Sequence, residues 1–347
     1  MSEPTTHADA AAAVSSNSAS ALIRRFLGSA AGRNIGLVIA LVILLIVGTI
    51  TAGDRFTNVA NILTIVRLAS VTGVLAIGMT FVIIAGGIDL SVGATYMFTS
   101  VVCGTIMIRV GGAEGAALGI TIGILAGLLV GIANGVISTY LKINPLIATL
   151  AMSFIILGLT KLVSQAGKEG VGQIRVDFEE FTWIAKTKPL GISLPTWIAF
   201  ILVVVLGIVL WRSTFGRYVY AAGGNAEAAR LAGIRVNLVR IATFALAGTA
   251  AGIAGVIDLA RVPSVPESDA IATTLTFTVL AGMVVGGTSI LGGEGAVWRT
   301  VLGILFIAML YNGFTLLRVD PLFQGIALGV IILLAVGFDA WSRYRKR

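Results

Sequence analysis

The sequence predicts an all-α fold, a polytopic transmembrane helical bundle of about ten spanning helices. The chain is 57% hydrophobic and 12% charged, whereas soluble domains carry about 25% charged residues. Its apolar runs reach the roughly 20 residues that a helix needs to cross a hydrocarbon core of about 30 Å. Because lipid offers no partners for backbone polar groups, such runs are expected to be helices. A β-barrel would require alternating polarity, which the stretch 35–47 does not show.

Ten apolar runs follow one another along the chain. The first follows a tail poor in bulky apolar residues, the glycine-rich stretch 86–93 separates the second from the third, and a long polar loop, 166–194, precedes the sixth. A basic loop, 212–238, follows the sixth. An even number of spans is required if both termini lie on the same side, and eight is the alternative. The expected spans are 35–52, 68–88, 90–109, 115–139, 145–165, 193–211, 239–260, 271–291, 296–314 and 322–341.

The positions of lysine and arginine predict the orientation. With a cytoplasmic N-terminus, fourteen of the 24 Lys and Arg residues fall on the cytoplasmic side, and both terminal flanks agree. This gives a disordered cytoplasmic tail (1–34), a permease domain (35–341) with a periplasmic loop (166–194) and a cytoplasmic loop (212–238), and a cytoplasmic C-terminal tail (342–347). The net charge of +8 then reflects orientation and contact with anionic membrane lipids, and no nucleic-acid partner is expected.

Cysteine and histidine are too rare to build a metal centre. The one cysteine, Cys103, lies inside an apolar run, and the one histidine, His7, lies in the tail. An intramolecular disulfide and a thiol metal cluster are therefore excluded, and no metal site is predicted.

The stretch 86–93 contains the most informative polar residue, Asp89. A carboxylate at the bilayer centre costs about 3 kcal/mol, so Asp89 is expected at a helix end or in a wet cavity. Two compatible roles are that Asp89 caps the next helix and that it lines the solute path at a broken helix. The polar side chains at helix breaks that are candidates for lining this path are Asp89, Ser91, Asn134, Thr276, Thr278 and Asn312.

A short helix is expected within the loop 212–238. Asn225 or Gly224 can cap it, residues 226–232 have high helix propensity, and Gly233 can end it. One interpretation is a helix held by lipid head groups through the arginines around it, Arg230, Arg235 and Arg240. Its alanine-rich surface lacks the bulky apolar groups of a membrane-surface helix, which favours a groove on a protein partner instead.

Four segments in this order resemble those of a known family: 78–94 (GMTFVIIAGGIDLSVGA), 134–150 (NGVISTYLKINPLIATL), 215–236 (FGRYVYAAGGNAEAARLAGIRV) and 284–296 (VVGGTSILGGEGA). They are similar to the ribose/xylose/arabinose class of ABC-importer permeases, and the resemblance covers most of the chain from about residue 60 onward. The motifs are specific as a set, whereas each glycine-rich piece alone is weak. No strand–turn–helix unit surrounds the glycines at 286–295, so a dinucleotide loop is not expected there.

The resemblance implies a transport permease in a bacterial inner membrane, not an enzyme. It also implies three partners: a second permease copy or a paralogue, a cytoplasmic ATP-binding subunit and a periplasmic sugar-binding protein. The chain has no G-x-x-x-x-G-K-[ST] phosphate loop, so ATP and Mg²⁺ are expected on the ATP-binding subunit and no cofactor on this chain. The residues that match the family's ATPase-coupling motif are Gly223, Gly224, Asn225, Glu227, Ala228, Ala229, Arg230 and Gly233.

A weak internal repeat in the sequence predicts an inverted pseudo-repeat in the structure. Asn134-Gly135 with Pro145 downstream recurs as Asn312-Gly313 with Pro321, the first on the inside and the second on the outside.

Other functions and other solutes stay open. Glu294 stands where the family usually has arginine, so pentose, hexose and polyol are all compatible with the sequence. An ion-coupled secondary transporter is the main alternative, although ionisable groups within the expected spans are few beyond Asp89. A scaffolding membrane protein would give the loop 212–238 no purpose.

Overall fold

The computed structural model describes residues 30–167, 175–176, 178–262 and 268–344. Most of the predicted N-terminal tail, part of the predicted periplasmic loop and the last residues of the chain lie outside the described residues. The described part is almost entirely helical, and its elements are α2 (Ala30–Ala52), α3 (Asp54–Thr57), α4 (Val59–Ile84), α5 (Val92–Val110), α6 (Gly112–Tyr140), α7 (Pro145–Gly167), α8 (Glu179–Lys186), η1 (Pro189–Gly191), α9 (Leu194–Arg212), α10 (Thr214–Gly224), α11 (Ala226–Leu231), α12 (Val236–Arg261), α13 (Asp269–Val285), α14 (Val297–Leu316) and α15 (Pro321–Tyr344).

The ten predicted spans correspond to ten helices of 17 or more residues. Among the described residues, eight helices are long and apolar enough to cross a membrane on that basis alone. The remaining two are shorter apolar helices, namely α13 and the Pro321–Gly337 part of α15. The prediction of ten spans matches the ten long helices, and the alternative of eight matches the helices that meet this criterion of length and hydropathy. The all-α membrane fold is confirmed.

Some predicted boundaries were wrong. The α4 helix begins at Val59, not at residue 68, because the Asn58 side chain caps it by accepting the Ala60 N–H at 2.8 Å. The α13 helix ends at Val285, not at residue 291, because a glycine turn follows it, in which Thr288 N–H donates to the Met283 carbonyl at 3.0 Å.

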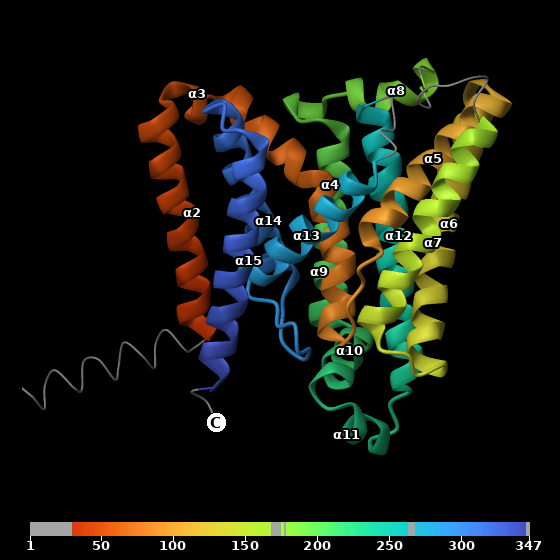
Figure 1. Cartoon of the computed structure of the whole chain (residues 1–347), viewed down its shortest axis with the longest axis vertical. Helices are drawn as coiled ribbons and strands as arrows, with labels where there is room; N and C mark the ends of the chain where they lie inside the picture. Colours follow the sequence, from red (N-terminus) through yellow and green to blue (C-terminus); the bar gives the residue numbers. More distant parts are fainter. Residues whose placement is uncertain (1–29, 168–174, 177, 263–267, 345–347) are drawn as a thin grey trace, which may run out of the picture.

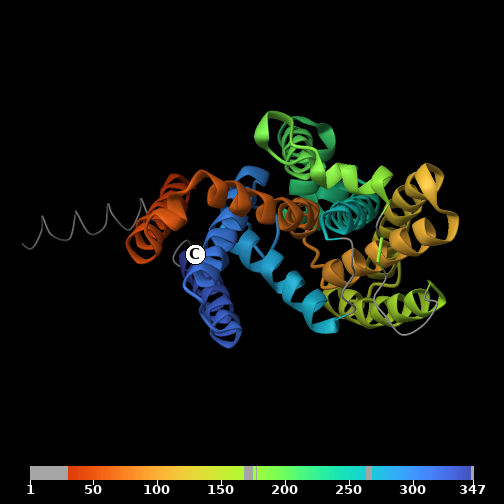
Figure 2. The same cartoon turned by 90° about the horizontal axis from the view of Figure 1, so that it is seen from above.

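The long helices run between two ends of the molecule (Figure 1). The helices α10 and α11 and the C-terminal part of α15 lie at one end, which we call the α11 end. The helices α3 and α8 lie at the opposite end, which we call the α8 end. Seen from above, α2 stands at one edge and α6 at the opposite edge, with α4 and α12 between them (Figure 2).

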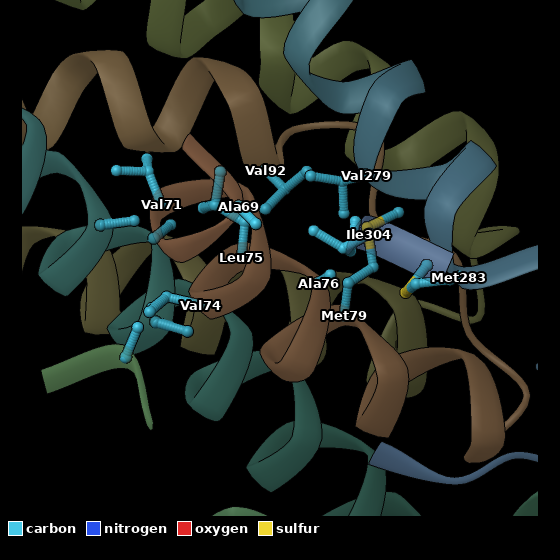
Figure 3. Packing of buried hydrophobic residues seen from close by; sticks show 14 of the residues in the cluster. Ala69, Val71, Val74, Leu75, Ala76, Met79, Val92, Val279, Met283 and Ile304 are labelled. Atoms are coloured by element: carbon cyan, nitrogen blue, oxygen red, sulfur yellow. The ribbon is translucent and has the colours of Figure 1, made fainter. Parts of the chain in front are cut away.

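The core of the molecule is built around α4. This helix packs against α12, α14, α9 and α13, and several of its side chains, Leu75, Ile77, Met79, Phe81 and Ile83, are 0% exposed. Figure 3 shows Leu75 and Met79 in one cluster with side chains from α13 and α14. A helix that is apolar on every face belongs in the centre of a bundle, so the composition of α4 explains its position.

The α6 and α12 helices approach so closely that only glycine fits between them. A Cβ atom on Gly127 would lie 2.3 Å from the carbonyl oxygen of Gly248, and one on Gly131 would lie 2.2 Å from the carbonyl oxygen of Phe244. A Cβ atom on Gly248 would in turn lie 2.1 Å from the carbonyl oxygen of Gly127. Small residues four apart allow this approach between membrane helices.

Two helix connections at opposite ends of the molecule have matching geometry (Figure 1). In each, a basic residue adopts a φ of 54°, Lys142 after α6 and Arg318 after α14. Two residues later, Asn144 or Asp320 accepts the backbone N–H just beyond the following proline, at 2.9 and 2.8 Å. The packing matches too, since α6 packs on α12 as α14 does on α4. These correspondences support the predicted inverted pseudo-repeat.

Candidate functional site

The α4 helix ends inside the molecule, and seven residues separate it from α5. Gly86 N–H donates to the Ile83 carbonyl at 2.9 Å, and Gly87 N–H donates to the Val82 carbonyl at 2.9 Å. Gly86 has a φ of 81°, as this helix-ending turn requires. The chain then continues without helical structure, and we call residues 85–91 the α4–α5 break. It leaves backbone groups that other side chains have to satisfy.

Asp89 lies buried in this break, with 3% of its surface exposed. One of its carboxylate oxygens accepts the Ser91 backbone N–H at 2.8 Å and the Ser91 hydroxyl at 2.6 Å. The prediction that Asp89 caps the next helix is therefore wrong in register, because Ser91 precedes α5 and α5 has no side-chain cap. Asp89 instead stabilises a local turn within the break, in which its carboxylate accepts both hydrogen bonds from Ser91.

Three helices supply polar side chains to the break and to the first turn of α5 that follows it. Asn134 on α6 donates its amide N–H to the Ser91 hydroxyl at 2.8 Å. Thr276 on α13 accepts the Gly93 N–H at 3.1 Å, and Thr149 on α7 accepts the Leu90 N–H at 2.9 Å. The side-chain amide oxygen of Asn134, Oδ1, is buried and has no hydrogen-bond partner. The break and three helices, α6, α7 and α13, thus meet at one polar cluster, the break cluster, made of Asp89, Ser91, Asn134, Thr149 and Thr276.

The structure places the other two predicted path residues away from this cluster. Thr278 donates its hydroxyl to the Thr274 carbonyl within α13 at 2.8 Å. Asn312 on α14 exchanges two hydrogen bonds of 2.9 Å with Asn61 at the beginning of α4. Sequence reasoning missed Thr149, since a threonine inside an apolar helix gives no signal of its own.

The predicted short helix is present at the α11 end. Asn225 caps α11 by accepting the N–H groups of Glu227 at 3.1 Å and Ala228 at 3.0 Å, and Gly233 follows with a φ of 81°. Ala229 is 5% exposed and faces the rest of the chain. Leu231 is 89% exposed at the tip, which is costly for a large apolar side chain in water.

The segment that carries α11 is packed directly on the end of α4. A Cβ atom on Gly223, in α10, would lie 1.7 Å from the Ile84 carbonyl oxygen. That oxygen also accepts the Gly293 N–H at 2.9 Å. A Cβ atom on Gly292 would lie 3.0 Å from the Gly86 Cα. Backbone from α10, from the end of α4 and from the loop after α13 meets here without side chains, and we call this contact the glycine junction.

Arg240 on α12 fastens the junction. Its Nε–H donates to the Ala85 carbonyl at 3.2 Å, and its Nη2 lies 3.5 Å from the Ala222 carbonyl oxygen. One guanidinium therefore reaches both the end of α4 and α10. From the sequence, Arg240 counted as a positive charge that orients the chain and as one of the arginines that could hold the short helix to lipid head groups.

The arrangement has a mechanical consequence. A force on α11 passes through α10 and the glycine junction to the end of α4 with no flexible side chain between them. The break cluster follows within a few residues. The geometry thus joins a surface helix to a buried helix break. Within the described ranges, no three carboxylate, histidine or cysteine side chains gather as a metal site would require.

Comparisons with known proteins give concordant results. A family model for the branched-chain amino acid transport system, permease component, matches residues 61–336. The ribose import permease protein RbsC of Escherichia coli (strain K12) is 35% identical over 303 residues, which are 87% of this chain and 92% of that protein. RbsC of Bacillus subtilis (strain 168) is 37% identical over 309 residues, 88% of this chain and 92% of that protein. The L-arabinose transport system permease protein AraH of Escherichia coli (strain K12) is 35% identical over 278 residues, 80% of this chain and 82% of that protein. No solved structure matches significantly.

Proposed function

This chain belongs to the family of permease components described for branched-chain amino acid transport systems, and on that premise we propose that it moves a monosaccharide or a similar small polar solute inward. It is a multi-pass membrane permease, not an enzyme. The family description names amino acids, whereas the relatives RbsC and AraH are named for ribose and arabinose. Because identity to those relatives extends over most of the chain, a pentose is the first solute to test.

Energy for this movement comes from a separate subunit that binds ATP and Mg²⁺, while this chain binds no cofactor. A relative at 36% identity is named as a probable ABC transporter permease, which supports this assignment. The α11 helix with its exposed Leu231 fits a groove on the ATP-binding subunit. The coupling residues are those matched in the sequence, from Gly223 to Gly233. A periplasmic solute-binding protein delivers the solute at the α8 end.

The α11 end faces the cytoplasm in this proposal, and so do both termini. A second permease copy completes the path in the bacterial inner membrane, with lipid around the pair. The residues proposed to shape the path are those of the break cluster, whose side chains are buried within one chain. They hold the broken backbone in place and position the path without facing it.

The observation that carries the proposal is the glycine junction between α10 and the end of α4. When nucleotide draws the ATP-binding subunits together, displacement of α11 shifts the end of α4 and the α4–α5 break. The path then changes from outward-open to inward-open. The nucleotide supplies the difference in affinity between the two states.

Uptake in proteoliposomes tests this function. Liposomes containing the permease, its ATP-binding subunit and ATP inside them, with the binding protein outside, should accumulate radiolabelled ribose or arabinose. Omitting the ATP-binding subunit should abolish accumulation, and collapsing the proton and sodium gradients should not affect it. Accumulation that needs an ion gradient and no ATP would instead establish the ion-coupled alternative.

A further inference from the structure

A cavity of about 580 Å³ opens at the α11 end, beside the glycine turn at the end of α4. Its walls come from the α6–α7 connection, the beginning of α12 and α11. The side chains important here are Ser138, Lys142, Asn144, Arg230, Asn237 and Arg240. The cavity shares Arg240 with the glycine junction and Arg230 with the proposed coupling residues, but neither role accounts for the space between these cations and Lys142.

The cavity is cationic. Lys142, Arg230 and Arg240 come from three separate elements, and no aspartate or glutamate is among its lining residues. In the part of the chain that the structure describes, none of the three forms an ion pair. Three cations kept close together repel one another unless an anion lies between them.

Other lining groups also favour an anion. The α12 helix begins at this cavity without a side-chain cap; its Val236 N–H already donates to the Ile234 carbonyl at 2.9 Å, whereas the N–H of Asn237, a lining residue, remains available as a donor. The Ser138 hydroxyl oxygen is buried and has no partner, which leaves a hydroxyl donor unused. Such donors together with lysine and arginine are the usual ligands of phosphate groups in proteins.

We infer that this cavity binds a phosphate-bearing anion, either the head group of an acidic phospholipid or free phosphate. The bound anion joins Arg230 of α11 to Arg240 of α12 and to Lys142 beside α7. It stiffens the connection between the surface helix and the bundle. This last consequence rests on the proposed coupling function, whereas the binding itself does not.

Binding is measured on the purified full-length permease in detergent, by thermal unfolding. Sodium phosphate is compared with sodium chloride at equal ionic strength, and micelles containing phosphatidylglycerol are compared with micelles containing phosphatidylcholine. One of the two anionic additions should raise the unfolding temperature of the wild type in a saturable way. A phosphate effect identifies the free anion, and an effect of phosphatidylglycerol alone identifies the lipid.

Charge variants locate the site. Each cation is worth about fivefold in affinity, so Lys142→Gln with Arg230→Gln should weaken binding by about 25-fold. Lys142→Arg should retain it. Arg217→Gln, which removes a cation of α10 outside the cavity, is the matched control and should bind as the wild type does.

Three results would overturn the inference. In the first, neither anion stabilises the wild type. In the second, the double variant binds the anion as tightly as the wild type does. In the third, the double variant keeps anion binding and loses association with the ATP-binding subunit. The cations would then bind acidic side chains of that partner. These assays measure no transport, so their failure is separate from failure of the proposed function.

Discussion

Glycine brings backbones together in two regions of this molecule, with different consequences. Between α6 and α12, Gly127, Gly131 and Gly248 lie within continuous helices, whose hydrogen bonds hold both partners rigid. At the glycine junction, Gly223 meets the end of α4 where the helix has stopped and the backbone has turned. The first region is a rigid contact between two helices, and the second is a contact at which the backbone can shift. A change in the first should therefore damage folding, and a change in the second should damage transport.

The largest expected effect is on folding. In Gly131→Leu, the new side chain has to displace the α12 backbone, because a Cβ atom there would already lie 2.2 Å from the Phe244 carbonyl oxygen. Overpacking of this kind costs about 1–3 kcal/mol or more, so the yield of folded protein should fall about tenfold. Fluorescence-detected size exclusion measures that yield. Gly158→Leu, on α7 with open space around it, should give a normal yield, and equal yields would refute the rigid interface.

The next effect separates transport from folding. In Gly223→Ala, a Cβ atom 1.7 Å from the Ile84 carbonyl oxygen forces α10 away from the end of α4. Because α10 lies at the α11 end of the bundle, the chain should still fold, with a yield within about twofold of the wild type, while uptake falls by up to about tenfold. Gly73→Ala, on α4 with no neighbour within 4 Å, is the control. Normal uptake by Gly223→Ala would remove the junction from the mechanism.

A smaller effect is expected in the break cluster. Asp89→Ala leaves the Ser91 N–H and hydroxyl without their acceptor, at a cost of about 1–3 kcal/mol, and uptake at equal expression should fall about fivefold. Asp89→Asn retains an acceptor oxygen and should keep at least about half of the uptake. If Asn is as harmful as Ala, the negative charge of Asp89 has a role of its own.

The smallest effect concerns a hydrogen bond next to the junction. The Tyr220 hydroxyl donates to the Gly295 carbonyl at 2.8 Å, and burial raises the pKa of Tyr220, so that it stays protonated at neutral pH. Tyr220→Phe removes one neutral hydrogen bond worth about 1 kcal/mol. Uptake should fall by less than about threefold, without a new pH dependence between pH 6 and 8. A larger loss of uptake would mean that the loop after α13 moves together with the glycine junction during transport.

The sequence was sufficient for the helices and for α11 but not for the contacts between them. Apolar runs predicted the ten long helices, and Asn225 with Gly233 predicted α11, because these signals act within a few residues. The bounds of α4 depended on Asn58, a capping signal that apolar length does not reveal. The polar side chains that complete the break cluster come from α6, α7 and α13, and no local sequence pattern shows that these helices lie together. The roles of Gly223 and Arg240 depend in the same way on which backbone lies opposite.

The glycine spacing of α6 was the most informative signal left unused. Gly123, Gly127, Gly131 and Gly135 recur every four residues, and Gly248 and Gly252 repeat that spacing on α12. This pattern is typical of two membrane helices that pack closely. The spacing alone therefore favours α12 as the neighbour of α6.

The central claim is that α11 lies on the cytoplasmic side, where an ATP-binding subunit reaches it. The native Cys103 is buried and 0% exposed, so single cysteines introduced at Ala228 on α11 and at Glu180 on α8 report accessibility to a membrane-impermeant maleimide. The account predicts labelling of Ala228→Cys only in inside-out vesicles and of Glu180→Cys only in intact spheroplasts. Labelling of Ala228→Cys from the outside of intact spheroplasts would contradict it.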